Sequence, residues 1–406
     1  MESRPMLPVS EALDRLRALV PPLPPERLPL EAALGRILAE DAAARLTQPP
    51  FDASAMDGYA LRADEAKPGA RLRVVGEAAA GRPWAGRLGP GEAVRIFTGA
   101  ALPEGAGHVA MQEDAAREGD EIRLLDSLDP AANIRAAGRD FRAGEILIPA
   151  GRRIGPRELG LLASMNLPEV WVGRAPRLGI LPMGDELVSP GADPGPGGVV
   201  ASAQYGLLGL ARQAGAAARL LPIAPDDLDA LRAILRGAAE EFDLLVTIGG
   251  ASVGDHDHLR PALAAEGAEL VFHRLALRPG KPLTAAQLGG LAVLGLPGNP
   301  VSAQVCGELF LRPALERLMG GEGTARALRA ARLAEALPAN GPREHYLRAT
   351  LRHGPEGDLV RPFADQDSSR ARLLTEAQAL IRRAARAPAA EAGAWVEILP
   401  LEAPWS

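Results

Sequence analysis

The stretch LAVLGLPGNPVSAQ, Leu291–Gln304, is the segment from which the fold is most readily deduced. Its apolar run ends abruptly in Pro-Gly-Asn-Pro, and a helical pattern begins at Val301. A short apolar run bounded by Pro and Gly is typical of a buried strand. The stretch therefore predicts a strand, a rigid turn and a helix, with backbone groups presented at the turn.

Four further apolar runs repeat this pattern between residues 176 and 320. They read RLGILPMG, ARLLPIAP, DLLVTIGG and ELVFHRLAL, and helical stretches such as YGLLGLARQAG and DLDALRAILRGAAEE alternate with them. Strands that alternate with helices indicate a mainly parallel sheet covered on both faces. In such sheets, ligands bind outside the carboxyl ends of the strands.

The residues that follow these five strands are rich in glycines, acids and hydroxyls. They are Gly184-Asp185-Glu186, Asp226-Asp227, the segment 251–257, the segment 278–282 and the segment 297–302. Because the carboxyl ends of parallel strands share one edge of the sheet, we expect these groups to converge.

Three acids at this edge, Glu186, Asp226 and Asp257, are candidate ligands for Mg²⁺. Mg²⁺ prefers oxygen ligands and is usually bound together with substrate phosphates. Taken alone, Asp226 is more simply interpreted as the N-cap of the helix that follows it. His256 and His258 flank Asp257, but zinc is disfavoured because no clustered cysteine or third histidine accompanies them.

The glycine-rich GGASVG, residues 249–254, contributes Gly250, Ser252 and Gly254. It is either a flexible turn or a phosphate-binding loop, since it leads into a helix with free N–H groups. It has neither the P-loop spacing nor the dinucleotide fingerprint, which disfavours ordinary P-loop chemistry. The Pro297–Pro300 turn, with Gly298 and Asn299, and Ser302 in the following helix are suited to an anion for the same reason.

Lysine is rare in this chain, because only Lys67 and Lys281 stand among its 45 basic residues. Lys281 lies between glycine and proline at a strand end, a poor position for a generic solvated charge. Ammonium and guanidinium differ in size, hydration and donor geometry. We therefore interpret Lys281 as an anion-binding residue.

The composition limits the classes of function. A net charge of −6 without a basic block does not suggest nucleic acid or anionic membrane as partners. No apolar run reaches the length of a membrane span and no signal-peptide pattern is seen, so we expect a cytoplasmic protein. The lone Cys306 lies in an apolar helical pattern and is expected to be a buried structural thiol.

The remainder of the chain has a different pattern. Helices are predicted over 9–20 and 30–40, a β-rich region over 46–150, a helix and a strand over 155–172, and small β elements from about 328. The β-rich region holds a second polar cluster of turn residues that includes Asp57, Thr98 and Asp140. Ordinary turn chemistry accounts for each of them equally well.

Seven ordered segments together resemble the MoeA family of molybdopterin molybdenumtransferases, which includes the gephyrin E-domain. They are PPFDASAMDGYALR, IFTGAALPEGA, NIRAAGRDFRAGE, MGDEL, TIGGASVGDHDHL, LRPGKP and LPGNPVSA, and they span almost the whole chain. The resemblance implies an elongated helical domain (1–45 and 146–174), an inserted β domain (46–145), an α/β domain like that of molybdopterin adenylyltransferases (175–325) and a C-terminal β-barrel (326–406). It also implies a homodimer in which the β domain of one subunit faces the α/β site of the other.

The reaction that the resemblance implies is insertion of molybdate into adenylated molybdopterin, with release of AMP and dependence on Mg²⁺. Its functional positions transfer to Asp57, Thr98, Asp140, Glu186, Asp226 and Asp257 as catalytic residues, and to Lys281, Pro297 and Pro300 in the anion loops. Arg343, Arg348 and Ser368 fit the positions implicated in molybdate binding. Implied protein partners are the adenylyltransferase and proteins that accept the finished cofactor.

Some residues depart from the family pattern. Arg278 replaces the first lysine of the usual KPGKP, Asp367 stands where glycine is usual before Ser368, and Gln378 replaces an expected asparagine. An acid beside a molybdate site would repel the anion. Asp227 also competes with Asp226 for one acidic position. Two rival functions share parts of this pattern: molybdopterin adenylylation, and a pterin-binding scaffold without turnover.

Overall fold

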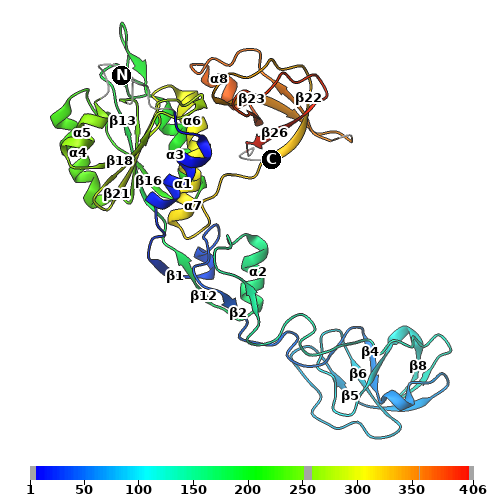
Figure 1. Ribbon diagram of the computed structural model, residues 1–406. Coiled ribbons are helices and arrows are strands. Elements are labelled where there is room, and N and C mark those ends of the chain that lie inside the picture. The colour runs from blue at the N-terminus through cyan, green and yellow to red at the C-terminus, as the bar shows by residue number, and fades with distance from the viewer. Residues whose placement is uncertain (1–5, 251–257, 356, 402–406) are drawn as a thin grey trace.

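The computed structural model describes residues 6–250, 258–355 and 357–401. It is an elongated molecule in which the α/β domain and a small barrel lie at one end and the inserted β domain at the other (Figure 1). Among the described residues no helix is long and apolar enough to cross a membrane.

The α/β domain is built on a six-stranded sheet of order β16-β13-β17-β21-β20-β18. The strands are β13 (Arg177–Pro182), β16 (Ala217–Leu220), β17 (Leu244–Ile248), β18 (Glu269–His273), β20 (Thr284–Leu288) and β21 (Leu291–Leu296). The five strands expected from the sequence are confirmed, and β16, β13, β17 and β21 are parallel neighbours. The sequence pattern does not predict β20, which runs antiparallel to both β18 and β21.

Helices cover both faces of this sheet, as the alternating pattern predicts. They are α3 (Ala203–Gln213), α4 (Leu228–Glu241), α5 (Leu259–Ala265) and α6 (Pro300–Cys306), which continues through a π-helical segment (Gly307–Leu311) into α7 (Arg312–Leu318). One apolar core joins α3, α6 and α7 to one face, and another joins α4 and α5 to the opposite face. Cys306 is fully buried in the first core, so the prediction of a structural thiol is confirmed.

Helix α1 (Val9–Leu19) also belongs to the α/β domain. Ala12, Leu13 and Leu16 are buried in the same core as β13 and β21, although the resemblance places this segment in the elongated domain. The domain boundaries as a whole stay predictions.

The segment that connects the α/β domain to the inserted β domain is built mostly from paired short strands. β1 (Pro25–Pro29) pairs with β12 (Glu169–Gly173), β2 (Ala42–Ala43) pairs with β11 (Ile146–Ile148), and α2 (Pro156–Ser164) packs beside them. The helix predicted over 30–40 is wrong. Only Leu30–Ala32 form a 3-10 turn, because Gly35 has a φ of +79° and Ile37 and Leu38 form β-bridges instead.

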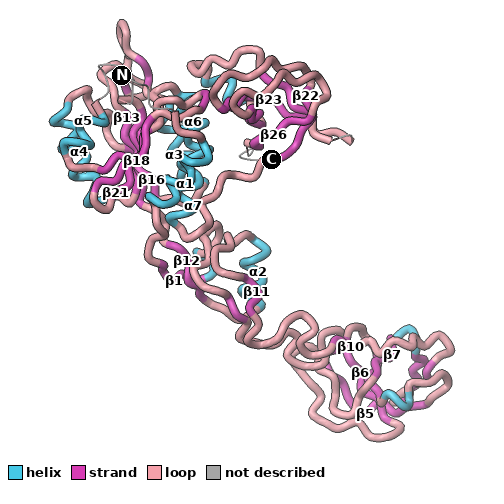
Figure 2. The backbone as a smooth tube through the Cα atoms, in the orientation of Figure 1, coloured by secondary structure: helices cyan, strands magenta, loops and turns pink. Residues whose placement is uncertain are grey.

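The inserted domain is a six-stranded sheet of order β7-β4-β6-β5-β9-β8 (Figure 2). Its strands are β4 (Gly58–Leu61), β5 (Arg71–Ala78), β6 (Glu92–Ile96), β7 (His108–Met111), β8 (Ala115–Glu118) and β9 (Glu121–Leu124), with β3 (Ala53–Ser54) and β10 (Ile134–Arg135) paired beside it. The two 3-10 turns are η2 (Ala63–Glu65) and η3 (Gln112–Asp114).

The C-terminal domain is a closed five-stranded barrel. Its order is β23-β24-β22-β26-β25, and pairing of β25 with β23 closes it. The strands are β22 (Arg329–Leu333), β23 (Glu344–Arg352), β24 (Leu359–Pro362), β25 (Ala379–Arg383) and β26 (Trp395–Pro400), and α8 (Ala371–Glu376) precedes β25. β19 (Leu277–Arg278) pairs with β23, which joins the barrel to the α/β domain. The short β14 (Leu187–Val188) and β15 (Val199–Val200) complete the fold.

Candidate functional site

The carboxyl ends of four parallel strands meet as expected. The backbone N–H of Asp226 donates to Asp185 Oδ1 at 3.1 Å, which joins the loops after β13 and β16. The N–H of Gly249 donates to Leu296 O at 3.1 Å, and a side chain at Gly298 would lie 3.4 Å from Gly249 Cα. Glu186 is exposed at this edge and Asp226 is partly exposed.

The two neighbouring acids after β16 have different roles. Asp227 is the N-cap of α4, because its Oδ1 accepts a hydrogen bond of 2.7 Å from Ala230 N. The sequence-based suggestion that Asp226 caps this helix is therefore wrong. The Asp226 carboxylate has no hydrogen bond or ion pair with any described residue, which leaves it available to a ligand.

The remaining residues predicted at this edge are only partly described. Ser252, Gly254 and Asp257 lie outside the described residues. Gly250 adopts a φ of +64°, and a Cβ there would lie 2.6 Å from Met183 Cε, so a side chain at this bend would require Met183 to move. In the described part of the chain, no group of three acids, histidines or cysteines is placed to hold a metal.

Six of the predicted substrate-binding residues line one cavity of about 340 Å³, which we call the cation pocket. It lies where the 278–282 loop meets β23 and the loop before α8. The predicted members are Arg278, Lys281, Ser302, Arg343, Arg348 and Ser368. Arg278 and Lys281 are exposed, and neither forms an ion pair with any carboxylate of the described residues. The pocket thus presents an excess of positive charge, with Asp367 as the one acid in its lining.

Local packing fixes the 278–282 loop. Gly280 has a φ of +118°, and a Cβ there would lie 2.5 Å from the Sγ of buried Cys306. A side chain at this position would therefore displace the loop that carries Arg278 and Lys281.

Arg348 organises the opposite wall of the pocket. Its side chain is fully buried, and its guanidinium donates to the backbone oxygens of Arg370, Asp367 and Asp365 at 3.2, 2.9 and 3.5 Å. The same loop is fixed to α6, since Ser368 O accepts a hydrogen bond of 3.3 Å from Val301 N. That N–H, expected from the sequence to be free for an anion, is therefore engaged.

Asp367, an acid in the lining of the cation pocket, is held in its ionised form. Its Oδ1 accepts hydrogen bonds from Ser369 N at 2.8 Å and from Ser369 Oγ at 2.7 Å. These bonds, together with the nearby charges of Arg348 and Arg370, lower the pKa of the carboxyl. The negative charge is stabilised within its own loop.

The Pro297–Pro300 turn does not line the cation pocket. Gly298 packs against Gly249, and Pro300 lines a separate cavity. The Oδ1 of Asn299 is buried and has no hydrogen-bond partner among the described residues. An unsatisfied buried oxygen beside the strand ends is a candidate contact for a ligand donor.

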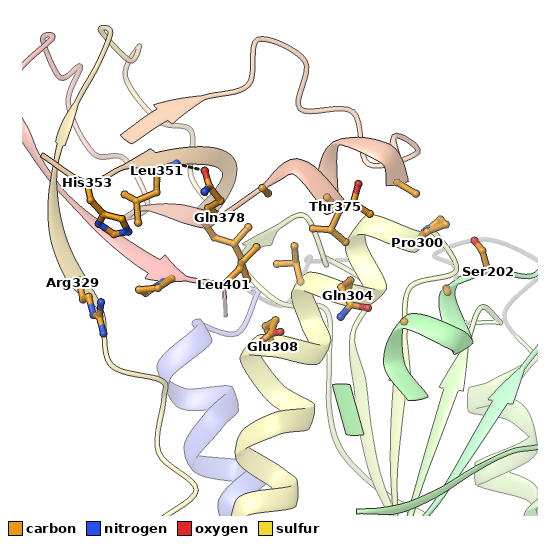
Figure 3. Close-up of a pocket in the computed structure, with 18 residues that line it drawn as sticks. Ser202, Pro300, Gln304, Glu308, Arg329, Leu351, His353, Thr375, Gln378 and Leu401 are labelled. Atoms are coloured by element: carbon orange, nitrogen blue, oxygen red, sulfur yellow. Dashed lines mark hydrogen bonds between the residues drawn. The ribbon is translucent and has the colours of Figure 1, made fainter. Parts of the chain in front are cut away.

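The second cavity has a volume of about 820 Å³ and was not expected from the sequence. Figure 3 shows it between α6 and the barrel, with Gln304 and Glu308 on one wall and His353, Leu351 and Gln378 on the other. Its walls come from several elements that are far apart in the sequence, so no sequence motif marks it. α6 and α8 separate it from the cation pocket, because each helix or its preceding loop contributes to both linings.

The second predicted cluster lies in the inserted domain. Thr98 donates from both its N and its Oγ1 to Asp57 Oδ1, each at 2.8 Å. These two bonds, the backbone one first, lower the pKa of Asp57. Asp140 is exposed in a turn where its N–H donates to Gln48 O. The inserted domain that carries this cluster and the α/β domain that carries Glu186 and Asp226 lie at opposite ends of the molecule (Figure 1). A single subunit therefore does not bring the two clusters together.

Three family models match the chain in order. The MoeA N-terminal region (domain I and II) matches residues 7–166, the probable molybdopterin binding domain matches 179–317, and the MoeA C-terminal region (domain IV) matches 330–401. A molybdopterin molybdenumtransferase of Nostoc sp. is 36% identical over 86% of this chain and 83% of its own length. The chain belongs to the MoeA family.

Two further relatives extend the MoeA match to the full length. A molybdopterin molybdenumtransferase of Bacillus subtilis is 33% identical over 100% of this chain and 98% of its own. The solved structure of the molybdopterin biosynthesis moeA protein from Pyrococcus horikoshii OT3 has a TM-score of 0.85 at 27% identity and covers 98% of this chain and 100% of that one. The multidomain MoeA fold expected from the motifs is thereby confirmed.

Proposed function

We propose that this protein is a molybdenumtransferase that inserts molybdate into adenylated molybdopterin and releases AMP, and that the cation pocket holds the molybdate. The observation that supports this most is the convergence of Arg278, Lys281, Arg343 and Arg348 with Ser302 and Ser368 around a 340 Å³ cavity. A small dianion requires this combination of positive charge and hydrogen-bond donors.

The adenylated pterin is assigned to the carboxyl ends of the parallel strands, where Gly249 and Gly298 lie against each other. Gly298 permits close approach of the backbone, and Gly250, with Ser252 and Gly254 beyond the described residues, belongs to the loop proposed for phosphate. In this arrangement Lys281, in the loop between β19 and β20 that lines the cation pocket, contacts the anion to be transferred.

Glu186 and Asp226, together with Asp257, are the proposed Mg²⁺ ligands. Their carboxylate oxygens are the donor type that Mg²⁺ prefers, and Asp227 is engaged as the helix cap whereas the neighbouring Asp226 carboxylate is not. When bound, Mg²⁺ neutralises pyrophosphate charge and polarises phosphorus as a Lewis acid. Glu186 and Asp226 also orient the attacking oxygen, which comes from molybdate or water, and no covalent enzyme intermediate is invoked.

A homodimer completes this site. The pair Asp57–Thr98, with Asp140, carries functional groups at the end of the chain opposite the strand-end acids. We infer that the inserted domain of one subunit faces the α/β domain of its partner. We place the protein in the cytoplasm, with the adenylyltransferase and cofactor-accepting proteins as further partners.

Purified protein incubated with adenylated molybdopterin, Mg²⁺ and molybdate tests the proposal. We expect AMP to be released faster when molybdate is present. Binding of the adenylate without molybdate-stimulated release of AMP contradicts the transferase and favours a pterin-binding scaffold. Formation of adenylated product from ATP and molybdopterin would favour the adenylyltransferase instead.

A further inference from the structure

A buried imidazole lies on the wall of the cation pocket, and nothing in the proposed reaction uses it so far. His345 is 9% exposed, and it lines the cavity together with Arg278 and Lys281. No sequence motif marks this histidine, because it sits inside an ordinary strand, β23.

Three neighbouring strands place guanidinium groups on either side of this ring. Arg278 of β19 is the register partner of His345 on one side, and Arg383 of β25 is its partner on the other. Residues opposite one another on adjacent strands share a face of the sheet. Arg343, two residues before His345 in the chain, points to the same face by strand alternation.

The charges around His345 keep its ring neutral. Burial, followed by Arg278, Arg343, Arg348 and Arg383, lowers the pKa of His345 to about 4. A neutral imidazole has one N–H donor and one acceptor nitrogen. No hydrogen bond to the ring comes from any residue that the structure describes, so both nitrogens are available to a guest in the cavity.

We propose that His345 donates a hydrogen bond to the oxyanion in the cation pocket and is a specificity-determining residue for it. The inference rests on the proposed function of this pocket. A neutral donor adds a directed contact without changing the charge balance set by the cations and Asp367. A carboxylate at the same place would pair with Arg278 or Arg343 and remove positive charge from the site.

The second guanidinium neighbour does not compete for this role. Arg383 donates to the backbone oxygens of Pro338 and Pro388, so it supports the wall rather than the cavity. Arg278 and Lys281 are exposed on long flexible side chains, whereas His345 is held by the strand. A fixed donor distinguishes anions by geometry more sharply than a mobile charge.

The test measures the dissociation constant of the full-length protein for molybdate by calorimetry at pH 7.5, with three substitutions. His345→Gln keeps a neutral donor and is expected to bind within about 3-fold of the original protein. His345→Leu removes the donor and is expected to bind about 10-fold more weakly, the effect of one lost hydrogen bond. His345→Asp is expected to bind about 100-fold more weakly, because it adds repulsion and neutralises a guanidinium.

Thermal unfolding of each variant establishes that the fold is intact, and saturating molybdate should restore the turnover number of His345→Leu while KM stays raised. Equal affinity of His345→Leu and the original protein, with weakened binding by Lys281→Ala, overturns the role of His345 alone. Absence of molybdate binding by the original protein overturns the proposed function of the pocket. The two failures are therefore distinguishable.

Discussion

At the scale of single residues, the chain itself provides a matched pair of lysines. Lys281 lines the cation pocket, and Lys67, the other lysine, is exposed in the inserted domain. We expect Lys281→Ala to weaken molybdate binding by about 10-fold or more, since an uncompensated charge next to the anion is lost. Lys67→Ala is the control and should bind normally. Equal affinities in calorimetry would remove Lys281 from the site.

Thr98 offers a second residue-scale prediction, in the pH dependence of the reaction. Its N–H and hydroxyl stabilise ionised Asp57 and lower the pKa of that carboxyl. A carboxylate that acts in its ionised form becomes protonated, and its function is lost, as pH falls through its pKa. Thr98→Val removes the hydroxyl donor and raises this pKa, so the acid limb of the AMP-release profile should move to higher pH. Thr98→Ser should leave the limb in place, and an unshifted Thr98→Val profile contradicts the role of ionised Asp57.

At the scale of elements, two adjacent acids before α4 have different roles: Asp227 stabilises the helix, and Asp226 is a proposed metal ligand. Asp227 caps the helix and Asp226 does not. Asp227→Ala should lower the free energy of unfolding by about 1 kcal/mol, the usual cost of losing an N-cap. Asp226→Ala should leave the unfolding midpoint in urea nearly unchanged and abolish most of the Mg²⁺-dependent release of AMP. The reverse result would exchange the roles of the two acids.

Some of these elements could be predicted from the sequence and others could not, depending on how clearly their hydrophobic pattern and turn residues mark them. The five strand ends were predictable because a short apolar run that stops at turn residues is seldom anything but a buried strand. β20 was missed because TAAQL has weak strand propensity, although the Gly289-Gly290 pair between it and β21 is a hairpin signal. The helix expected over 30–40 failed because Gly35 and two β-bridges outweigh helical periodicity.

The cation pocket shows a different limit. Arg278, Ser302 and Arg348 come from distant parts of the chain. The pairing of β19 with β23 and the hydrogen bond from Val301 N to Ser368 O bring their segments together. These residues were identified through the resemblance to the MoeA family. The local sequence around Arg343 and Arg348 has only the pattern of an ordinary strand. His345 was invisible for the same reason, since its neighbours in β19 and β25 are set by tertiary register.

At the scale of the whole molecule, the elongated shape of the subunit requires that the two clusters meet through a second subunit if they act together. The Asp57–Thr98 pair and the strand-end acids lie at opposite ends of one subunit (Figure 1). If both act in one reaction, the groups must come from two chains, and each dimer has two such composite sites. We therefore infer that the two clusters act together across a dimer, and the proposed reaction depends on this more than on any single residue.

Complementation between two inactive variants tests this inference most directly. Asp57→Asn and Glu186→Gln each remove one cluster while preserving side-chain shape, and each alone should release little AMP. Subunits of the two variants, mixed in equal amounts and allowed to exchange, should regain about a quarter of the original activity, because half of the dimers are mixed and each has one intact site. A mixture that stays inactive, although native mass spectrometry detects mixed dimers, would contradict a site shared between subunits.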